Sequence, residues 1–184
     1  MSAAEEIFAF LEALGIAVRT AGHAPANTMA DCAAVDARLG ALTVKNIFLT
    51  TKNRGKCYLC ITRPEARFRT ADISRQAGSS RLSFAPEEML WEKLRARPGS
   101  ASPMGLIFDS AKDVTLLVDD ALRDAPVLAF HPCDNTRTLA MAGSDFFGVF
   151  LPAAGVTPVF VEIHDFIEPP AGESGEMNRP SIKP

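Results

Sequence analysis

LTVKNIFLTTKNRGKCYLCITR, residues 42–63, decides the fold, because it holds two apolar segments separated by a polar turn. Residues 44–50 and 57–62 are rich in β-branched and aromatic side chains, which favour strands. The Lys-Asn-Arg-Gly sequence between them, at residues 52–55, is typical of a tight turn. The stretch therefore predicts a β-hairpin.

Lys45 occupies an unusual place, at the start of the first of these strands. Side chains alternate between the two faces of a strand, so Ile47 and Leu49 are predicted to share one face. Val44 and Phe48 would lie on the opposite face, and Lys45 falls on the side of Ile47. An ammonium group there is either functional or simply exposed at the strand start, and spacing alone favours the exposed lysine.

Outside the hairpin, helical and extended patterns alternate along the chain. Apolar spacing and capping residues predict helices over residues 3–14, 29–39, 71–77, 86–94 and 144–150, with a Ser2–Glu5 capping box on the first and Ser144 capping the last. Short strands are predicted over residues 17–20, 81–84, 114–118, 127–130, 138–141 and 159–163. Residues 97–108 are expected to form a loop that runs into a further strand.

This order of elements predicts a single domain of the α/β (α+β) class, with a mixed, largely antiparallel sheet of about seven strands flanked by helices. A length of 184 residues and a hydrophobic content of 47% suit one core. The domain is expected to span residues 1–166. Residues 167–184, rich in Pro, Gly and Glu, are expected to form a disordered tail.

Composition and the N-terminus predict a cytoplasmic protein. There is no run of 18 uninterrupted apolar residues, so no transmembrane helix is expected. The opening MSAAEEIFAFLEALG has acidic residues and no basic leader, unlike a secretory signal. Cys57 and Cys60 form a CxxC, but residues i and i+3 of a strand point to opposite faces, so we expect buried structural residues and no metal site.

Charge is distributed unevenly along the chain. Residues 43–97 hold 12 Lys and Arg against five Asp and Glu, a local charge of +7, whereas the whole chain carries −3. A segregated charge of this kind can steer a polyanion such as a nucleic acid to one face. The plainer alternative is a solvated face of an ordinary domain.

The common catalytic motifs G-x-S-x-G, H-E-x-x-H and the P-loop are absent from the sequence. Three other stretches concentrate residues that can do chemistry: Val-Lys-Asn at 44–46, Gly-Ser-Ala-Ser-Pro at 99–103 and Phe-His-Pro-Cys-Asp-Asn-Thr at 130–136. Together with "VKNIFLTTKNRGKCYL", "SSRLSFAPEEMLWEKL", "PGSASPMGLIFD" and "FHPCDNTRTLAM", they give the chain a specific pattern.

In these stretches the chain resembles the YbaK/ProX superfamily of aminoacyl-tRNA deacylases, and within it the branch of free-standing prolyl-tRNA editing proteins. Members of this superfamily are relatives of the editing domain inserted in bacterial prolyl-tRNA synthetases. The resemblance covers about residues 4–165. It implies the same fold, hydrolysis of a mischarged aminoacyl-tRNA, and no metal or organic cofactor.

The resemblance also implies roles for particular residues. It makes Lys45 the principal catalytic residue, and the physical reason is that a fixed ammonium stabilises the oxyanion formed when an ester is hydrolysed. His131 would form the pocket wall and contact the substrate rather than act as a general base. The residues implied to bind substrate are Asn46, Gly99, Ser100, Ala101, Ser102, Pro103, His131 and Asn135. Asn135 is also expected to rigidify its turn together with Thr136. The residues implied to bind tRNA are Arg81 and Lys52.

The expected partners are the acceptor end of a mischarged tRNA and, by analogy, prolyl-tRNA synthetase. Alanine on proline tRNA is the expected substrate. The chain departs from the family's frequent His-Pro-Pro at His-Ala-Pro-Ala-Asn-Thr, residues 23–28, which borders the side-chain pocket. Deacylation of Cys-, Ser-, Thr- or another small aminoacyl-tRNA is therefore an alternative. A tRNA- or synthetase-binding module without catalysis is an alternative of a different class.

Overall fold

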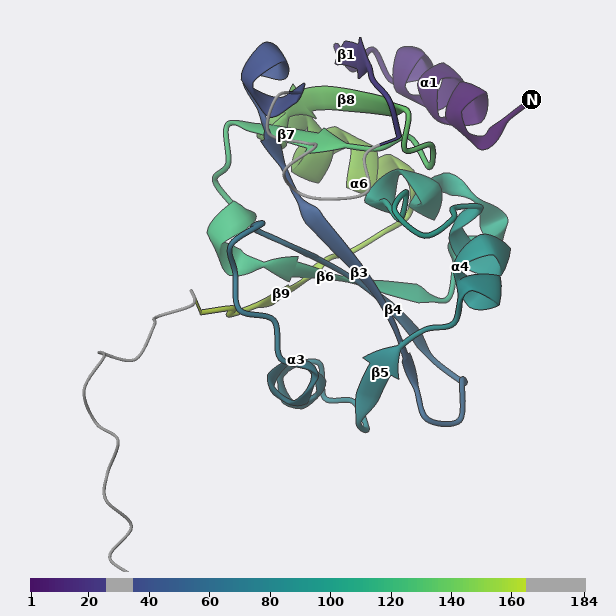
Figure 1. Cartoon of the computed structure of the whole chain (residues 1–184), viewed down its shortest axis with the longest axis vertical. Helices are drawn as coiled ribbons and strands as arrows, with labels where there is room; N and C mark the ends of the chain where they lie inside the picture. Colours follow the sequence, from purple (N-terminus) through teal and green to yellow (C-terminus); the bar gives the residue numbers. More distant parts are fainter. Residues whose placement is uncertain (26–34, 165–184) are drawn as a thin grey trace, which may run out of the picture.

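The computed structural model describes residues 1–25 and 35–164, which form two sheets with helices around them (Figure 1). A four-stranded sheet has the order β1-β8-β7-β2, and a five-stranded sheet has the order β5-β3-β4-β6-β9. The strands are β1 (Arg19–Gly22), β2 (Leu42–Thr43), β3 (Lys45–Thr51), β4 (Cys57–Thr62), β5 (Leu82–Phe84), β6 (Val114–Asp119), β7 (Val127–Phe130), β8 (Arg137–Ala142) and β9 (Val159–Val161).

Helices fill the connections between these strands. The α-helices are α1 (Ala3–Ala13), α3 (Thr70–Gln76), α4 (Glu87–Leu94), α5 (Gly143–Asp145) and α6 (Leu151–Ala153), and residues 35–39 are also helical. The 3-10 helices are η1 (Pro103–Ile107), η2 (Asp109–Ala111) and η3 (Asp120–Leu122), and η4 (Phe146–Phe150) is a π-helical turn. Within the described ranges, no helix is long and apolar enough to cross a bilayer.

The predicted hairpin and the predicted α/β class are confirmed. β3 and β4 pair antiparallel with Ile47 opposite Cys60, whereas β4, β6 and β9 run parallel to one another. One sheet was expected, and the structure has two. The division falls at Val44, the single residue between β2 and β3, because β2 joins the four-stranded sheet and β3 joins the five-stranded sheet. Nine strands are therefore present in the described residues, where about seven were expected.

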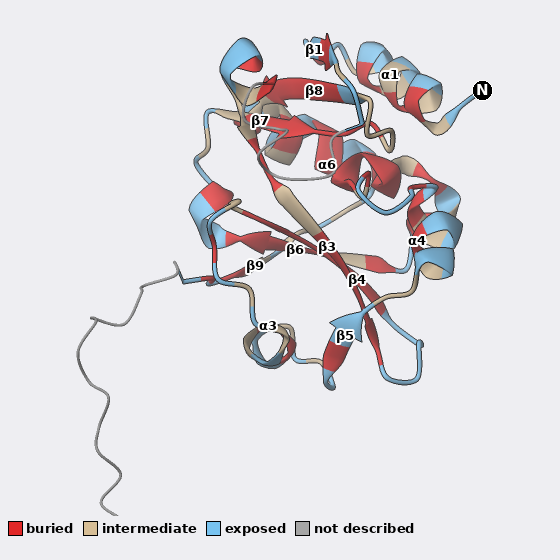
Figure 2. Cartoon of the chain, in the orientation of Figure 1, coloured by how far each residue is buried: buried red, intermediate tan, exposed pale blue. Residues whose placement is uncertain are grey.

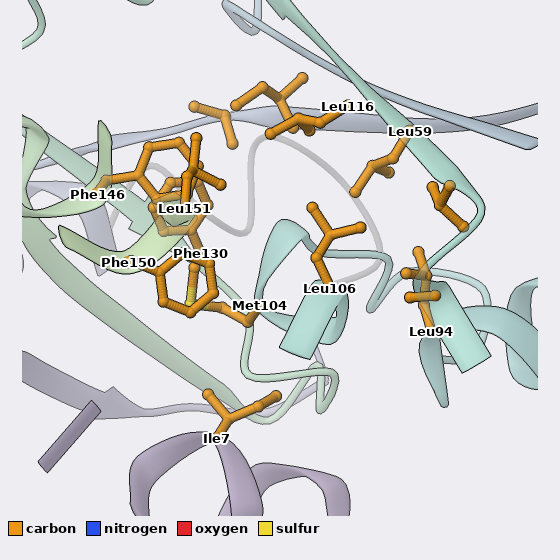
Figure 3. Packing of buried hydrophobic residues seen from close by; sticks show 14 of the residues in the cluster. Ile7, Leu59, Leu94, Met104, Leu106, Leu116, Phe130, Phe146, Phe150 and Leu151 are labelled. Carbon is orange, nitrogen blue, oxygen red and sulfur yellow. The ribbon is translucent and has the colours of Figure 1, made fainter. Parts of the chain in front are cut away.

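β3 is covered on both faces, as its alternating pattern predicted (Figure 2). Val44 and Phe48 belong to the largest cluster of buried side chains, which also takes in Phe130 and Met104 (Figure 3). Ile47 and Leu49 belong to a second cluster on the other face. The sheet that carries Lys45 is thus a central layer of the molecule.

The strand expected within residues 97–108 is wrong, because Pro103–Ile107 and Asp109–Ala111 form 3-10 helices. Ser102 begins the first of them, and its Oγ accepts a hydrogen bond from the N–H of Met104 at 3.2 Å. Gly105 packs so closely that an added Cβ would lie 2.7 Å from the carbonyl oxygen of Leu94. The sequence periodicity does not contain this tertiary contact.

Other helix boundaries also differ from the expectation. Ser144 lies inside a helix that begins at Gly143 and is capped by Ala142, because the chain turns tightly there against the backbone of Ala125. Pro86 is the N-cap of α4 and not its first residue. Only part of the helix predicted over residues 29–39, and nothing of the tail predicted over 167–184, falls within the described residues.

Candidate functional site

Lys45 lies where the chain passes from one sheet to the other (Figure 1). β2 runs parallel to β7 with Thr43 opposite Ala129, and the N–H of Val44 donates to the carbonyl oxygen of Ala129 at 3.4 Å. Lys45 follows Val44 as the first residue of β3, and His131 follows β7 two residues after Ala129, so both of these residues predicted from sequence come shortly after the β2–β7 pairing ends.

His131 is only 7% exposed and belongs to a row of polar side chains. Its Nδ1 lies 2.9 Å from the carbonyl oxygen of Arg137 and 3.4 Å from Oγ1 of Thr138. Thr138 Oγ1 is in turn 2.9 Å from Nε2 of His23, and the rings of His23 and His131 are 5.8 Å apart. The row crosses β7 and β8 and reaches the residue that follows β1.

The protonation state of His131 follows from these contacts. A carbonyl oxygen only accepts hydrogen bonds, so the bond to Arg137 requires a proton on Nδ1 of His131. Burial lowers the pKa of His131, against the raising effect of that hydrogen bond. In the neutral ring Nε2 is then an acceptor, and it has no hydrogen-bond partner among the described residues.

Asn46, next to Lys45, presents a second free acceptor. Its Nδ2 donates to the carbonyl oxygen of Val44 at 3.1 Å, which braces the junction of β2 and β3. Its Oδ1 is buried and has no partner in the described part of the chain. Because an unpartnered buried acceptor costs roughly 1–3 kcal/mol, this oxygen favours the approach of a donor from a ligand.

Residues 99–103 form a tight loop held by its own hydroxyl groups. Gly99 has a φ of 83°, which favours glycine. Ser100 Oγ donates to the carbonyl oxygen of Arg97 and accepts from its N–H, both at 3.0 Å. Ser100, Ser102 and Pro103 are buried and Ala101 is half-buried. The serines therefore shape the loop, and its backbone groups are what it can offer to a substrate.

Cys133 connects this loop region to the turn after His131. Its Sγ donates to the carbonyl oxygen of Leu94 at 3.3 Å, and an added Cβ on Gly105 would lie 3.1 Å from it. Burial raises the pKa of the Cys133 thiol to about 12, so it is no nucleophile. Across the described residues, no hydrogen bond or ion pair joins residues 99–103 to Lys45.

The turn itself is rigid, although not through Asn135. Thr136 donates from its N–H and from Oγ1 to Oδ1 of Asp134, at 2.9 and 2.7 Å. Thr136 thus makes hydrogen bonds within the turn, and their acceptor, Asp134, was missed by sequence reasoning. Asn135 is half-buried, and its side chain makes no hydrogen bond within the described residues.

The two predicted tRNA-binding residues meet at the other end of β3. Lys52 and Arg81 line an open groove of about 490 Å³ together with Arg54 and Phe84, whose side chain is 69% exposed. Lys52, Arg54 and Arg81 have no ion-pair partner among the residues described. From Lys45 to this end the strand rises roughly 20 Å, at about 3.3 Å a residue.

The charge of +7 over residues 43–97 is only partly available at the surface. Five of its bases form ion pairs, namely Arg63 with Asp119, Arg75 with Asp72, Lys93 with Asp113, Arg95 with Glu6 and Arg97 with Glu87. Three of these acids lie outside the segment, so the sequence count overstates the free charge. The groove around Lys52 and Arg81 is where unpaired cations remain together.

Sequence reasoning missed His23 and Thr138. His23 directly follows β1 as His131 directly follows β7, but the strand predicted over residues 17–20 ended before this position and so gave no such signal. Cys57 and Cys60 are buried, as expected, and belong to opposite core clusters. Within the described residues, no group of three His, Cys, Asp or Glu side chains is placed to hold a metal ion.

Comparison with known proteins points to one family. The sequence profile of the aminoacyl-tRNA editing domain matches residues 23–148. The chain is 28% identical over 145 residues to the prolyl-tRNA editing protein ProX of Acetoanaerobium sticklandii, covering 79% of this chain and 88% of that protein. It is 29% identical over 159 residues to prolyl-tRNA synthetase associated domain-containing protein 1 of Danio rerio, covering 85% of each.

Solved structures share the fold. The crystal structure of a proposed trans-editing enzyme for prolyl tRNA synthetase superposes with a TM-score of 0.66 at 15% identity, covering 90% of this chain and 99% of that one. The hypothetical protein APE2540 gives the same TM-score at 18% identity, over 86% of this chain and 98% of its own.

Proposed function

The chain belongs to the aminoacyl-tRNA editing domain family and is on that ground an aminoacyl-tRNA deacylase, and we propose that its substrate is Ala-tRNA(Pro), from which it removes alanine in trans. Water attacks the ester carbonyl carbon, the bond to the ribose oxygen breaks, and that oxygen takes up a proton. The products are free alanine and uncharged tRNA.

One observation carries this proposal: a cation and two unpartnered acceptors occur at the junction of the two sheets. Lys45 supplies the cation, and Asn46 Oδ1 and His131 Nε2 supply the acceptors. An aminoacyl ester has the complementary groups, since its carbonyl oxygen becomes negative during attack while its α-ammonium and ribose hydroxyl are donors.

Lys45 has the catalytic role in this proposal. Its ammonium stabilises the oxyanion of the tetrahedral intermediate, and the half-buried position strengthens that interaction relative to bulk water. The neutral ring of His131 and the amide of Asn46 orient the substrate by accepting hydrogen bonds. Residues 99–103, with Asn135 in the facing turn, present the loop surface against which the aminoacyl end binds.

Alanine is the proposed amino acid for a physical reason. A proline pocket in a synthetase rejects a smaller side chain by only about 1–3 kcal/mol per missing methylene, so a second, smaller pocket is needed to remove the error. The ProX relative is named as a prolyl-tRNA editing protein, which supports this choice. His131 is proposed as a wall of that pocket, and residues 26–28, also expected to border it, lie outside the described residues.

The groove with Lys52 and Arg81 is proposed to bind the tRNA backbone near its acceptor end. Its exposed, unpaired cations suit phosphates, and the distance of roughly 20 Å along β3 corresponds to several nucleotides from the ester. The name of the Danio rerio relative supports an association with prolyl-tRNA synthetase. We place the reaction in the cytoplasm, in one domain spanning residues 1–166.

A panel of aminoacyl-tRNAs tests the proposal. Ala-, Ser-, Cys- and Pro-tRNA(Pro) are incubated with equal enzyme, and release of the radiolabelled amino acid is followed. Rapid loss of alanine with Pro-tRNA(Pro) spared is the expected result. A preference for Ser or Cys would overturn the substrate and keep the reaction, whereas hydrolysis of none would favour a binding module.

A further inference from the structure

We propose that His23 is a positioning residue which acts through Thr138 to hold His131 with its Nε2 presented to the substrate as an acceptor. The inference rests on the proposed function, because it assigns His131 a contact with the aminoacyl end. His23 follows β1, Thr138 lies in β8 and His131 follows β7, so the chain of contacts crosses three neighbouring strands.

The direction of each hydrogen bond in this chain is fixed at its two ends. The carbonyl oxygen of Ala24 lies 2.7 Å from Nδ1 of His23 and can only accept, so this nitrogen carries a proton. Nε2 of neutral His23 is then an acceptor, and it takes the hydroxyl proton of Thr138 at 2.9 Å. At the other end, Nδ1 of His131 donates to the carbonyl oxygen of Arg137 at 2.9 Å.

Thr138 consequently turns a lone pair, and not its proton, toward His131. Its Oγ1 lies 3.4 Å from Nδ1 of His131, where it adds a second, weaker acceptor for the same N–H. Without His23 the hydroxyl proton is free to rotate toward His131 Nδ1, where it competes with the N–H bond to the Arg137 carbonyl oxygen and weakens the preference for the Nδ1 tautomer, so that the tautomer with the proton on Nε2 is also populated. That tautomer presents a donor where the substrate needs an acceptor.

The local fold holds His23 in place for this role. Its backbone N–H donates to the carbonyl oxygen of Thr136 at 2.9 Å, which extends the pairing of β1 with β8 by one step. Thr138 is 1% exposed, so water does not substitute for the His23 nitrogen at its hydroxyl. Among the neighbouring titratable groups, His23 lowers the pKa of His131, and the carboxylates of Asp134 and Asp36 raise it.

The first experiment reads the tautomer of His131 in the free protein by ¹⁵N NMR of the imidazole nitrogens at pH 7.5. The chain has three histidines, and the His164→Gln variant, changed at an exposed residue, assigns the spectrum and serves as the matched control. We expect His131 to carry its proton on Nδ1 in the wild type and in His164→Gln. His23→Leu should shift it to a mixture of tautomers, and His23→Gln, which keeps an acceptor, should restore the wild-type state.

The second experiment measures deacylation. His23→Leu and Thr138→Val should each lower kcat/KM about five- to tenfold, the size of one lost positioning hydrogen bond, whereas His23→Gln and Thr138→Ser should recover most of it. In a His131→Ala background His23→Leu should cost nothing further, because its effect passes through His131.

Two results would overturn the inference: an unchanged His131 tautomer in folded His23→Leu, or a loss of activity in His23→Leu that persists undiminished in the His131→Ala background. The NMR measurement needs no substrate. A protein that hydrolyses no aminoacyl-tRNA but shows the tautomer change would therefore refute the proposed function and leave the His23 contact standing.

Discussion

The two ends of β3 differ in burial, pairing and charge. At the Lys45 end, polar groups are half-buried or buried, and His131, Thr138 and His23 are joined by hydrogen bonds of 2.9–3.4 Å. At the hairpin end, Lys52 and Arg81 are exposed and line an open groove beside an exposed Phe84. One strand thus connects a fixed polar edge with a solvated cationic surface.

Under the proposed function, the Lys45 end would carry the chemistry and the hairpin end would carry tRNA binding. Stabilising a developing charge requires groups that are already oriented and partly removed from water. Holding a polyanion requires only exposed cations, whose contribution is large in sum, individually small and sensitive to salt. Substitutions at the Lys45 end should therefore change turnover and selectivity, and those at the hairpin end should change tRNA affinity.

The largest expected effect is that of Lys45→Ala. Loss of the ammonium should lower kcat for Ala-tRNA(Pro) at least about 100-fold, the size of removing one oxyanion stabiliser. Single-turnover deacylation measures it, and circular dichroism checks the fold. Lys56→Ala, an exposed lysine in the hairpin turn, is the matched control and should be near wild type. Wild-type turnover in folded Lys45→Ala would break the division between the two ends.

The next effect is a loss of selectivity in His131→Ala. In the proposed function the imidazole forms the pocket wall, and it is only 7% exposed, so its removal should enlarge the pocket and admit proline. We expect the ratio of the deacylation rates of Ala-tRNA(Pro) and Pro-tRNA(Pro) to fall about tenfold, which is roughly the discrimination that an apolar pocket achieves between substrates differing by one methylene group. His164→Ala, at an exposed histidine, should keep the ratio. A ratio that is unchanged in His131→Ala would remove His131 from the pocket.

A smaller effect is expected at the hairpin end. Arg81→Ala should raise KM for aminoacyl-tRNA about fivefold, because one exposed charge contact contributes about 1 kcal/mol. Hydrolysis of a short aminoacyl-adenosine mimic should keep its wild-type rate. The slope of log affinity against log salt should fall by about 1. Arg75→Ala, whose arginine pairs with Asp72 at 2.8 Å, is the control. Equal losses on both substrates would show that Arg81 does not contact tRNA.

Local patterns predicted the hairpin well because its residues contact one another across a short turn. The alternation of Val44, Ile47, Phe48 and Leu49 assigned both faces of β3 correctly, since that pattern depends only on strand geometry. The division into two sheets was not predictable in this way. Residues 42–51 continue a single extended pattern, and the break at Val44 depends on β7 pairing with β2 from elsewhere in the chain.

The same distinction applies to the candidate site. Resemblance singled out Lys45 and His131, and only the parallel pairing of β2 with β7 shows that the segments before them are neighbours. His23 and Thr138 are 115 residues apart in sequence, so no local pattern contains their contact. Gly105 likewise lies in a stretch that was expected to form a loop running into a strand, and its close approach to Leu94 in the 3-10 helix found there is a tertiary contact that no local pattern contains.

The smallest expected effect is a pH dependence of the free energy of unfolding that comes from His131. Burial lowers the pKa of His131 below the usual 6.5. Below pH 6.5 the unfolded chain therefore binds a proton at this residue that the folded protein resists, so the free energy of unfolding should fall as the pH falls from 6.5 toward the folded pKa. Urea unfolding at several pH values between 7.5 and 5 measures this slope.

His131→Gln should flatten that slope, and Arg81→Ala, at the hairpin end, should leave it unchanged. The ring of His23 lies 5.8 Å from the ring of His131, so the His23→Gln variant is measured alongside to separate the two histidines. Equal slopes in wild type and His131→Gln would show that His131 is not the group resisting protonation. The Lys45 end would then respond to pH no differently from the hairpin end.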